Sequence, residues 1–471
     1  MRKRRGSGRD GYTHAHIFMD TIAAISTAQG IGGIGVVRVS GEDAIAIADK
    51  VFESFDKSKL SELKGYRAKY GKVKDGDVYI DDAIALVYRA PHSFTGENTV
   101  EISCHGGLYI TRRVLRVLMN AGAKLAKAGE FTKRAFLNGK IDLTQAEAIM
   151  DIISSKSARE NELAFSTRDG VVVEKINEMR NSIVKIVSHL CAWADYPEDD
   201  IPQISVDLLK KQLAETQDTL KKLINSYDVG CVIKNGIKTV IIGRPNVGKS
   251  TLMNMLSGCE RSIVTDIPGT TRDIIEETVM LGDVPLVISD TAGIRQTDNL
   301  IEKIGVNKAK DSVRTAGLVF LVVDGSEDIS PEDEQILQLI DKNNTIVIIN
   351  KEDKAQKIDK EKIKKFTQNI VSLSAKNQKG LEKLSDMVYE MVGMSKFDAS
   401  ETVISNERQL NILKRALECV NEAAESVELN MTLDATTVSI QDAVQELMEL
   451  TGERASEKVV DEIFSRFCVG K

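Results

Sequence analysis

The sequence has few of the features that mark secreted, membrane-spanning or metal-binding proteins. Its six cysteines are scattered over 471 residues without a CxxC pair, and no histidine stands at metal-ligand spacing from them. No apolar run approaches the roughly 18 residues that a transmembrane helix requires. One tryptophan and seven prolines favour a helix-rich architecture over a β-sandwich. We therefore expect a cytoplasmic protein with reduced thiols and no membrane association.

The net charge and the length limit the kind of ligand and the number of domains that the chain can have. The net charge of −7 at pH 7 excludes an indiscriminate binder of polyanions, although a local basic patch could still hold RNA. A chain of this length is too long for one core and predicts two to four domains. Residues 1–18 are basic and lack the apolar segment of a signal peptide. We expect them to be a disordered extension or the product of a misplaced start codon.

The clearest motif is Gly243-Arg244-Pro245-Asn246-Val247-Gly248-Lys249-Ser250-Thr251. A β-branched run at 239–242 precedes it and a helix-like stretch at 251–256 follows, as a P-loop requires. The two glycines let backbone N–H groups turn toward a phosphate. Lys249 supplies charge for the β- and γ-phosphates, and the Ser250 hydroxyl is placed to ligate Mg²⁺. This stretch predicts a nucleotide-binding site.

Three further motifs each follow an apolar run, as expected of parallel strands with a site at their carboxyl ends. Asp290-Thr291-Ala292-Gly293 offers a carboxylate for Mg²⁺ and an N–H for the γ-phosphate. In Asn350-Lys351-Glu352-Asp353, the last carboxylate can accept both adjacent donors of guanine, which adenine lacks. Ser374-Ala375-Lys376 would cover the guanine O6. The four runs, at 239–242, 286–289, 318–323 and 345–349, predict a parallel sheet that binds GTP.

The segment Thr265-Asp266-Ile267-Pro268-Gly269-Thr270-Thr271-Arg272-Asp273 looks like a switch loop with a threonine hydroxyl available for Mg²⁺. Ile294 follows Gly293, whereas a Ras-like enzyme places a water-orienting glutamine there. An isoleucine cannot orient water. That role must therefore be filled by another residue.

The remaining residues form two kinds of pattern. Residues 20–137 read as short strands, turns and one helix, which predicts an α+β domain. The expected strands include 22–25, 36–39, 66–70, 83–88 and 100–105, and the helix covers 44–51. His105 stands beside two glycines and is read as either structural or catalytic; a lone histidine without a partner is more often structural.

Helical patterning begins after Gln145 and returns after about Glu401. We expect one helical face to carry Leu209, Leu213, Leu220 and Ile224. Two helical blocks on either side of an α/β segment suggest that the nucleotide domain is inserted into a helical domain. The alternative is two separate helical domains.

Several motifs together give a resemblance to a known family. They are Asn246 in the P-loop, Gly269-Thr270-Thr271-Arg272-Asp273, the terminal Phe467-Cys468-Val469-Gly470-Lys471, and the stretches at 129–140 and 195–202. In these the chain resembles the MnmE (TrmE) family of tRNA-modification GTPases from about Met19 to Lys471. One difference is Gln29-Gly30-Ile31-Gly32-Gly33, where the family often has Pro-Gly-Arg-Gly-Gly.

The resemblance implies a multi-domain α/β fold. Residues 19–138 would form an N-terminal α+β domain that binds a tetrahydrofolate and forms a homodimer. Residues 139–236 and 396–471 would form a discontinuous helical domain, into which a Ras-like P-loop G domain at 237–395 is inserted. The G domains would pair across the dimer during hydrolysis.

The resemblance also implies roles for individual residues. The expected GTP contacts are Asn246, Val247, Gly248, Lys249, Ser250, Thr251, Thr265, Asp266, Ile267, Pro268, Gly269, Thr270, Thr271, Asp290, Thr291, Ala292, Gly293, Asn350, Lys351, Asp353, Ser374, Ala375 and Lys376. The expected metal ligands are Ser250 and Thr271 for Mg²⁺, and Asn246, Thr265, Ile267 and Thr270 for K⁺. Glu302 would position the attacking water, and Cys468 would be either a reactive thiol or a packing residue. Folate would be held by Arg38, Glu101, Lys140 and Lys471.

The implied function is a potassium-dependent GTPase. With MnmG (GidA), in a heterotetrameric complex, it would add a carboxymethylaminomethyl or aminomethyl group at C5 of the wobble uridine U34 of certain tRNAs. The implied cofactors are GTP, Mg²⁺, K⁺ and a 5-formyl- or 5,10-methylene-tetrahydrofolate. One alternative is a ribosome-assembly GTPase, which would need an RNA-binding KH domain or basic tail after the G domain. Another alternative is a folate-dependent methyltransferase with an accessory GTPase. Binding of the flavoprotein MnmG would argue against this alternative.

Overall fold

The computed structural model describes residues 20–195, 206–258, 277–288, 316–394, 402–429 and 431–470. The chain divides into two compact units. The first comprises residues 1–150, 167–216 and 415–471, and the second comprises residues 151–166 and 217–414. The extension expected at residues 1–18 lies outside the described residues.

The first unit begins with a seven-stranded sheet in the order β3-β4-β5-β6-β2-β1-β7. Its strands are β1 (Ile22–Ile25), β2 (Ile34–Ser40), β3 (Phe52–Ser54), β4 (Arg67–Asp75), β5 (Val78–Tyr88), β6 (Thr99–His105) and β7 (Lys124–Leu125). All neighbours are antiparallel except β1 and β7, which are parallel. Helices α1 (Ala44–Val51) and α2 (Leu108–Asn120) share a hydrophobic core with this sheet.

Alternation along the strands separates the core of this sheet from its polar face. Side chains of a strand point to opposite faces in turn. Val37 and Ile102 are therefore fully buried in the core, whereas Arg38 and Glu101 lie on the other face. The pairing of β2 with β6 places Arg38 directly opposite Glu101.

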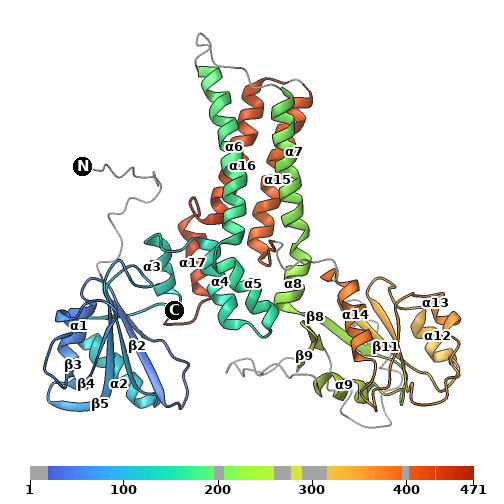
Figure 1. Ribbon diagram of the computed structural model, residues 1–471, viewed down its shortest axis with the longest axis horizontal. Coiled ribbons are helices and arrows are strands. Elements are labelled where there is room, and N and C mark those ends of the chain that lie inside the picture. Colours follow the sequence, from blue (N-terminus) through green and yellow to red (C-terminus); the bar gives the residue numbers. More distant parts are fainter. Residues whose placement is uncertain are drawn as a thin grey trace. The chain divides into compact units, whose positions relative to one another are not determined.

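Most of the chain outside the two sheets is helical. Between the N-terminal sheet and the G segment lie α3 (Glu130–Leu137), α4 (Leu143–Ser154), α5 (Ala158–Arg168), α6 (Val171–Asp195), α7 (Val206–Asn225) and α8 (Tyr227–Asn235); after the G segment come α15 (Glu407–Glu428), α16 (Leu433–Thr451) and α17 (Glu457–Ser465). Helix α6 packs along α16 (Figure 1), and Arg180 on α6 forms an ion pair with Glu453, just beyond α16. Helix α17 packs on α3 and α4 through an apolar cluster that includes Leu143 and Phe464. One helical domain is therefore built from both flanks of the G segment, and two separate helical domains are excluded.

The second unit contains a six-stranded sheet in the order β13-β12-β11-β8-β10-β9. Its strands are β8 (Ile237–Ile242), β9 (Glu277–Leu281), β10 (Val284–Ile288), β11 (Leu318–Asp324), β12 (Thr345–Asn350) and β13 (Ile370–Ser372), and its helices include α9 (Lys249–Gly258), α12 (Pro331–Leu337), α13 (Lys360–Lys364) and α14 (Leu381–Met391). The strands are parallel except for β9, which joins β10 in an antiparallel hairpin. Apolar clusters cover both faces, as expected of a parallel sheet. The predicted fold class, a multi-domain α/β protein with an inserted P-loop domain, is confirmed.

Two local predictions need adjustment. Tyr66 was expected in a strand, but its φ of +60° is incompatible with extended backbone, and β4 begins at Arg67. On α7 the buried position near the end of the apolar face is Leu223 rather than Ile224, which is half-buried. The spacing of three residues from Leu220 to Leu223 keeps this face aligned with the helical period.

Among the described residues, no helix combines the length and the apolar character that crossing a bilayer demands.

Candidate functional site

The P-loop connects the end of β8 to the start of α9, and its backbone takes conformations that few residues adopt. Gly243, Gly248 and the non-glycine Asn246 all have positive φ, at 143°, 102° and 62°. A Cβ at position 248 would lie 2.2 Å from Nδ2 of Asn350, so this position admits only glycine without rearrangement. The loop is thus shaped by steric requirements that the two glycines satisfy.

Asn350 and Lys351 join the P-loop to the loop after β12. Asn350 donates from Nδ2 to the carbonyl of Val247 at 2.9 Å and accepts at Oδ1 from the N–H of Ala375 at 3.0 Å. Lys351 donates from Nζ to the carbonyl of Asn246 at 2.9 Å. The loops after β8, β12 and β13 therefore converge at one edge of the sheet, as the sequence predicted from the strand ends.

Asp353 and Ser374 lie together at this edge. The Ser374 hydroxyl donates to Oδ1 of Asp353 at 2.5 Å, and this hydrogen bond lowers the pKa of the Asp353 carboxyl. Asp353 and the neighbouring Lys376 are exposed, whereas Ser374 and Ala375 are buried. An ionised, exposed carboxylate held by a serine can accept two hydrogen bonds from a planar base.

Lys249 lies at the start of α9 and folds back over its own loop. Its Nζ donates to the carbonyls of Gly243 at 2.8 Å and Arg244 at 2.7 Å. Burial lowers the pKa of Lys249. Ser250 and Thr251, the next two residues of α9, are exposed at its first turn. Lys249 and Ser250 thus occupy the N-terminus of α9, the part of a helix that attracts a phosphate.

Several predicted site residues lie outside the described residues. They are Thr265, Asp266, Ile267, Pro268, Gly269, Thr270 and Thr271 of the expected switch loop, Asp290, Thr291, Ala292 and Gly293, the expected water-positioning Glu302, and Lys471.

Asp324, the last residue of β11, is a site residue that the sequence analysis missed. Its carboxylate forms an ion pair with Nζ of Lys351 and accepts hydrogen bonds from the N–H and hydroxyl of Ser326. Burial raises the pKa of Asp324, but the hydrogen bonds from Lys351 and Ser326 outweigh it and the net shift is downward. The sequence offered only a weak signal, a carboxylate directly after the apolar run at 318–323, without a loop motif to mark it.

A second group of polar side chains lies on the face of the N-terminal sheet that is opposite its core. Arg38 binds Oε1 of Glu101 through Nε at 2.8 Å and Nη2 at 2.7 Å, and Tyr88 donates to Oε2 at 3.1 Å. The guanidinium of Arg38 lies 5.6 Å from the ring centroid of the fully buried Phe131. Burial, followed by the charge of Glu101, raises the pKa of Tyr88. Tyr88 and Phe131 are further residues that the sequence analysis did not identify.

The end of the chain reaches this group. Arg38 donates from Nη1 to the carbonyl of Gly470 at 3.5 Å, and the Ser26 hydroxyl donates to the same oxygen at 3.2 Å. Gly470 has φ of +95°, and a Cβ there would lie 2.3 Å from the carbonyl oxygen of Ile25. The backbone just before Lys471 is therefore fixed beside Arg38.

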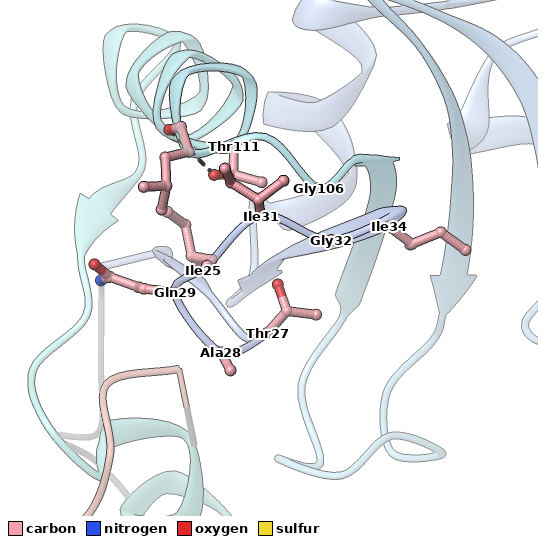
Figure 2. Close-up of a pocket in the computed structure, with 11 residues that line it drawn as sticks. Ile25, Thr27, Ala28, Gln29, Ile31, Gly32, Ile34, Gly106 and Thr111 are labelled. Atoms are coloured by element: carbon pink, nitrogen blue, oxygen red, sulfur yellow. Dashed lines mark hydrogen bonds between the residues drawn. The ribbon is translucent and has the colours of Figure 1, made fainter. Parts of the chain in front are cut away.

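A cavity of about 320 Å³ lies in the same unit, and Ile25 is one of the residues that line it. Figure 2 shows the loop with Thr27, Ala28 and Gln29 on one side of this cavity and Thr111 on α2 on the other. Its remaining lining residues are Gly30, Ile31, Gly32, Ile34, Gly106 and Leu108. The loop that differs from the family pattern thus borders a cavity that adjoins the contact of Gly470 with Ile25.

Lys140, Cys468 and His105 complete the set of predicted residues. Lys140 donates from Nζ to the carbonyl of Pro91 at 3.1 Å, and among the described residues no hydrogen bond or ion pair joins it to Arg38 or Glu101. Cys468 is exposed, and its carbonyl accepts from the N–H of Gly129. The imidazole of His105 is 72% exposed, and its Nδ1 lies 2.7 Å from Asp81. This hydrogen bond raises the pKa of His105.

Comparison with known proteins places this geometry in a family. The family model described as "GTP-binding protein TrmE N-terminus" matches residues 21–140, and that described as "MnmE helical domain" matches residues 143–468. A curated protein of Clostridioides difficile (strain 630), named tRNA modification GTPase MnmE, is 42% identical over 455 residues, which cover 96% of this chain and 99% of that protein. The chain belongs to the MnmE family.

Other members of the MnmE family show the same level of similarity. The tRNA modification GTPase MnmE of Carboxydothermus hydrogenoformans is also 42% identical, over 96% of this chain and 99% of its own length. Among solved structures, a variant of Aquifex aeolicus Era bound to GDP and AlF4⁻ is 28% identical over 39% of this chain and 66% of that chain, with a TM-score of 0.26. Membership of the MnmE family confirms the predicted family, and with it the enzyme class, a GTP hydrolase.

Proposed function

We propose that this chain is a potassium-activated GTPase that works with an MnmG-type flavoprotein on tRNA. Together they would add a carboxymethylaminomethyl or aminomethyl group at C5 of the wobble uridine U34, in the cytoplasm and with this chain as a homodimer. The observation that carries the proposal is the convergence of Lys249, Asn350 and Asp353 at one sheet edge, in a chain that matches named tRNA modification GTPases over almost its whole length.

The residues of the G site suit GTP and Mg²⁺. Lys249 and the N-terminus of α9 provide positive charge for the phosphates, and the Ser250 hydroxyl provides an oxygen ligand for Mg²⁺. In this proposal the exposed, ionised carboxylate of Asp353 accepts both donors of the guanine edge. Thr271, Asp290 and Gly293 would complete the site from the loops outside the described residues. In this proposal Glu302 orients the attacking water, because Ile294 cannot.

Asn246 suits a potassium ligand. Its main chain is held by Lys351, while its side chain is exposed beside the phosphate loop. The amide oxygen of a side chain on such a held backbone can coordinate a hard monovalent cation, which would offset the charge that develops on the phosphates. Thr265, Ile267 and Thr270 are the proposed remaining ligands.

Potassium dependence is tested by measuring GTP turnover of the full chain in K⁺ and in Na⁺ at equal ionic strength. We expect faster turnover in K⁺, and we expect Asn246→Ala to flatten this difference while nucleotide binding persists. Glu361→Gln, a change on the exposed surface of α13, is the matched control and should keep the full response. Equal turnover in the two salts for the parent chain would exclude the cation mechanism.

The polar face of the N-terminal sheet suits a tetrahydrofolate. A carboxylate such as Glu101 matches the adjacent N–H donors of a pterin, and Arg38, Lys140 and Lys471 match the carboxylates of its glutamate tail. The buried ring of Phe131 supports the guanidinium of Arg38. The cavity in Figure 2 is lined in part by Ile25, which precedes Ser26, and the Ser26 hydroxyl bonds the same Gly470 carbonyl as Arg38. We propose that the folate binds here and presents its one-carbon unit for the tRNA modification.

Helices follow the G domain where the ribosome-assembly alternative would require a KH domain. Among the described residues beyond 401, no strand is present, and α15, α16 and α17 account for most of the chain. A KH domain needs a sheet, so this alternative is disfavoured. GTP hydrolysis in the proposed scheme drives a conformational change, and the folate and the flavoprotein carry the chemistry.

The product-level experiment uses tRNA from cells that depend on variants of this chain. We expect Glu302→Ala to lower GTP turnover by about 10²-fold or more, as loss of a water-positioning group does. The same strain should lack aminomethylated wobble uridine in nucleoside mass spectrometry. Deletion of Lys471 should also remove the modified uridine while GTP turnover stays normal, and Glu361→Gln should change neither. Normal modification in the Glu302→Ala strain would break the link between hydrolysis and modification.

A further inference from the structure

Arg244, the second residue of the P-loop motif, reaches away from the loop to two carboxylates. Its Nη2 pairs with Glu327, and its Nε lies 3.2 Å from Oδ2 of Asp333. The Asp333 side chain is 2% exposed and that of Arg244 is 20% exposed, whereas Glu327 is 57% exposed. The contact with Asp333 is therefore a largely buried ion pair whose geometry does not make a hydrogen bond, because Nε of Arg244 has no hydrogen-bond partner among the described residues. The contact with Glu327 is a hydrogen-bonded ion pair at the surface.

Asp333 is fixed independently of Arg244. Its Oδ2 accepts from the N–H of Ser330 at 3.1 Å and from the Ser330 hydroxyl at 2.8 Å, while its own N–H donates back to that hydroxyl at 3.2 Å. This reciprocal pair forms the capping box at the start of α12. Oδ1 of Asp333 is buried and has no hydrogen-bond partner within the part of the chain that the structure describes. A fixed, buried carboxylate of this kind depends on a nearby cation for its charge compensation.

The segment from Asp324 to Asp333 restrains the P-loop directly through Arg244 and indirectly through Lys351. Asp333 holds the Arg244 side chain, and Asp324 holds Lys351, which donates to the carbonyl of Asn246. Lys249 adds a third contact from within the loop by donating to the carbonyl of Arg244. Contacts of Arg244, Lys249 and Lys351 therefore hold the backbone from 243 to 246, in which Asn246 has a positive φ.

We propose that Arg244 is a positioning residue, and that its ion pair with Asp333 braces the P-loop in the conformation that receives the nucleotide phosphates. The proposal rests on the assignment of the P-loop as the nucleotide site. A loop that is held in its binding conformation loses no affinity to alternative conformations. Release of the brace should therefore weaken binding and speed nucleotide release, while turnover at saturating GTP changes little.

The test measures how fast each variant of the full-length chain releases a bound fluorescent GDP analogue. Release is started by adding excess unlabelled GDP, in a buffer that contains both K⁺ and Mg²⁺. We expect Arg244→Met and Asp333→Asn each to accelerate release about tenfold through the lost preorganisation. Glu327→Gln should accelerate it by no more than about twofold, because exposed ion pairs contribute little. Arg244→Lys keeps the positive charge, so its release rate should lie between those of the parent chain and Arg244→Met. The control Glu361→Gln breaks an exposed pair on α13 and should leave release unchanged.

A double-variant cycle and thermal unfolding separate positioning from stability. If the two residues act as one brace, Arg244→Met combined with Asp333→Asn should release GDP no faster than the worse single variant. Multiplied effects in the double variant would overturn the brace. A lower melting temperature with unchanged release would show a purely structural ion pair and would also overturn it.

The variant Lys249→Ala shows which hypothesis is wrong, the brace or the assignment of the P-loop as the nucleotide site. Loss of nucleotide binding in Lys249→Ala with parent-like release in Arg244→Met would reject the brace alone. Parent-like binding in Lys249→Ala would reject the P-loop assignment on which the brace rests.

Discussion

The G-domain sheet and the N-terminal sheet both carry a group of functional side chains, but at different parts of their strands. In the parallel G sheet the polar residues stand at strand ends: the P-loop follows β8, and Asp324 and Asn350 are the last residues of β11 and β12. In the mostly antiparallel N-terminal sheet Arg38 and Glu101 stand within β2 and β6 and face each other across the pair.

This difference decides how each site depends on the rest of the fold. Parallel strands end at one edge, so short contiguous loops meet there without any particular side-chain register. In the N-terminal sheet, a shift of one residue between β2 and β6 would separate Arg38 from Glu101 and turn one of them to the core. Gly470, 432 residues after Arg38 in the sequence, adds a further long-range contact. The G site therefore depends on where the strands end, whereas the N-terminal site depends on strand register and on where the end of the chain packs.

The largest effect that tests this comparison is expected at Gly248. Gly248→Ala places a Cβ against Asn350 at a positive φ, so we expect GTP affinity to fall by about 10³-fold as the loop is forced out of shape. Gly258→Ala, at the end of α9, is the control and should bind normally, because no atom of the described residues lies within 4 Å of the new Cβ. Isothermal titration with GTP gives both values, and a fall of less than tenfold in Gly248→Ala would show that the loop is less constrained than its contacts indicate.

Asp353 should give the next largest effect, again confined to the G site. Asp353→Asn exchanges one acceptor for a donor, so we expect GTP to bind about 10²-fold more weakly, the range for losing a charged hydrogen bond. Xanthosine triphosphate, which carries a carbonyl in place of the guanine 2-amino group, should then be preferred. Competition between the two nucleotides measures the switch, and unchanged GTP affinity would reject Asp353 as the base-selecting residue.

The N-terminal group should respond more weakly and without any change in GTP binding. Glu101→Gln leaves Arg38 without its ionic partner and removes the proposed pterin acceptor, so we expect 5-formyl-tetrahydrofolate to bind about tenfold more weakly. Tyr88→Phe removes one neutral donor to Glu101 and should cost about threefold. Equilibrium dialysis with 5-formyl-tetrahydrofolate measures whether Glu101→Gln weakens binding more than Tyr88→Phe does. An equal or larger effect of Tyr88→Phe would make Tyr88 a direct ligand rather than a support.

The smallest expected effect is on stability, at a residue outside both groups. Burial raises the pKa of Asp142, which precedes α4, to about 6. A raised folded pKa means that Asp142 favours folding below about pH 4 and that this contribution is lost as pH rises through about 6. Asp142→Asn keeps the acceptor for the Gln145 N–H, so it should raise stability by on the order of 1 kcal/mol at pH 8 and not at pH 4. Thermal unfolding at both pH values tests this, and a gain of equal size at pH 4 would contradict the burial of a charge as its cause.

The sequence predicted the elements of the G domain well because their signals are local. The four apolar runs became β8, β10, β11 and β12 with shifts of one or two residues at their ends. β9 was missed, since a short antiparallel hairpin strand gives no motif of its own. Asp324 was missed because the end of β11 carries no recognisable loop motif, and Asp333 because its contact with Arg244 spans nearly ninety residues of sequence.

The sequence by itself determined the P-loop, the order of the strand-end motifs and the family, since each is written in contiguous residues whose chemistry follows from their own backbone and side chains. Only the tertiary structure decided that Tyr88 and Gly470 contact the Arg38 and Glu101 pair, and that Arg244 pairs with a buried Asp333. Those contacts depend on strand register and on where distant segments pack. Both are set by burial of the whole apolar core and not by any local stretch of the chain.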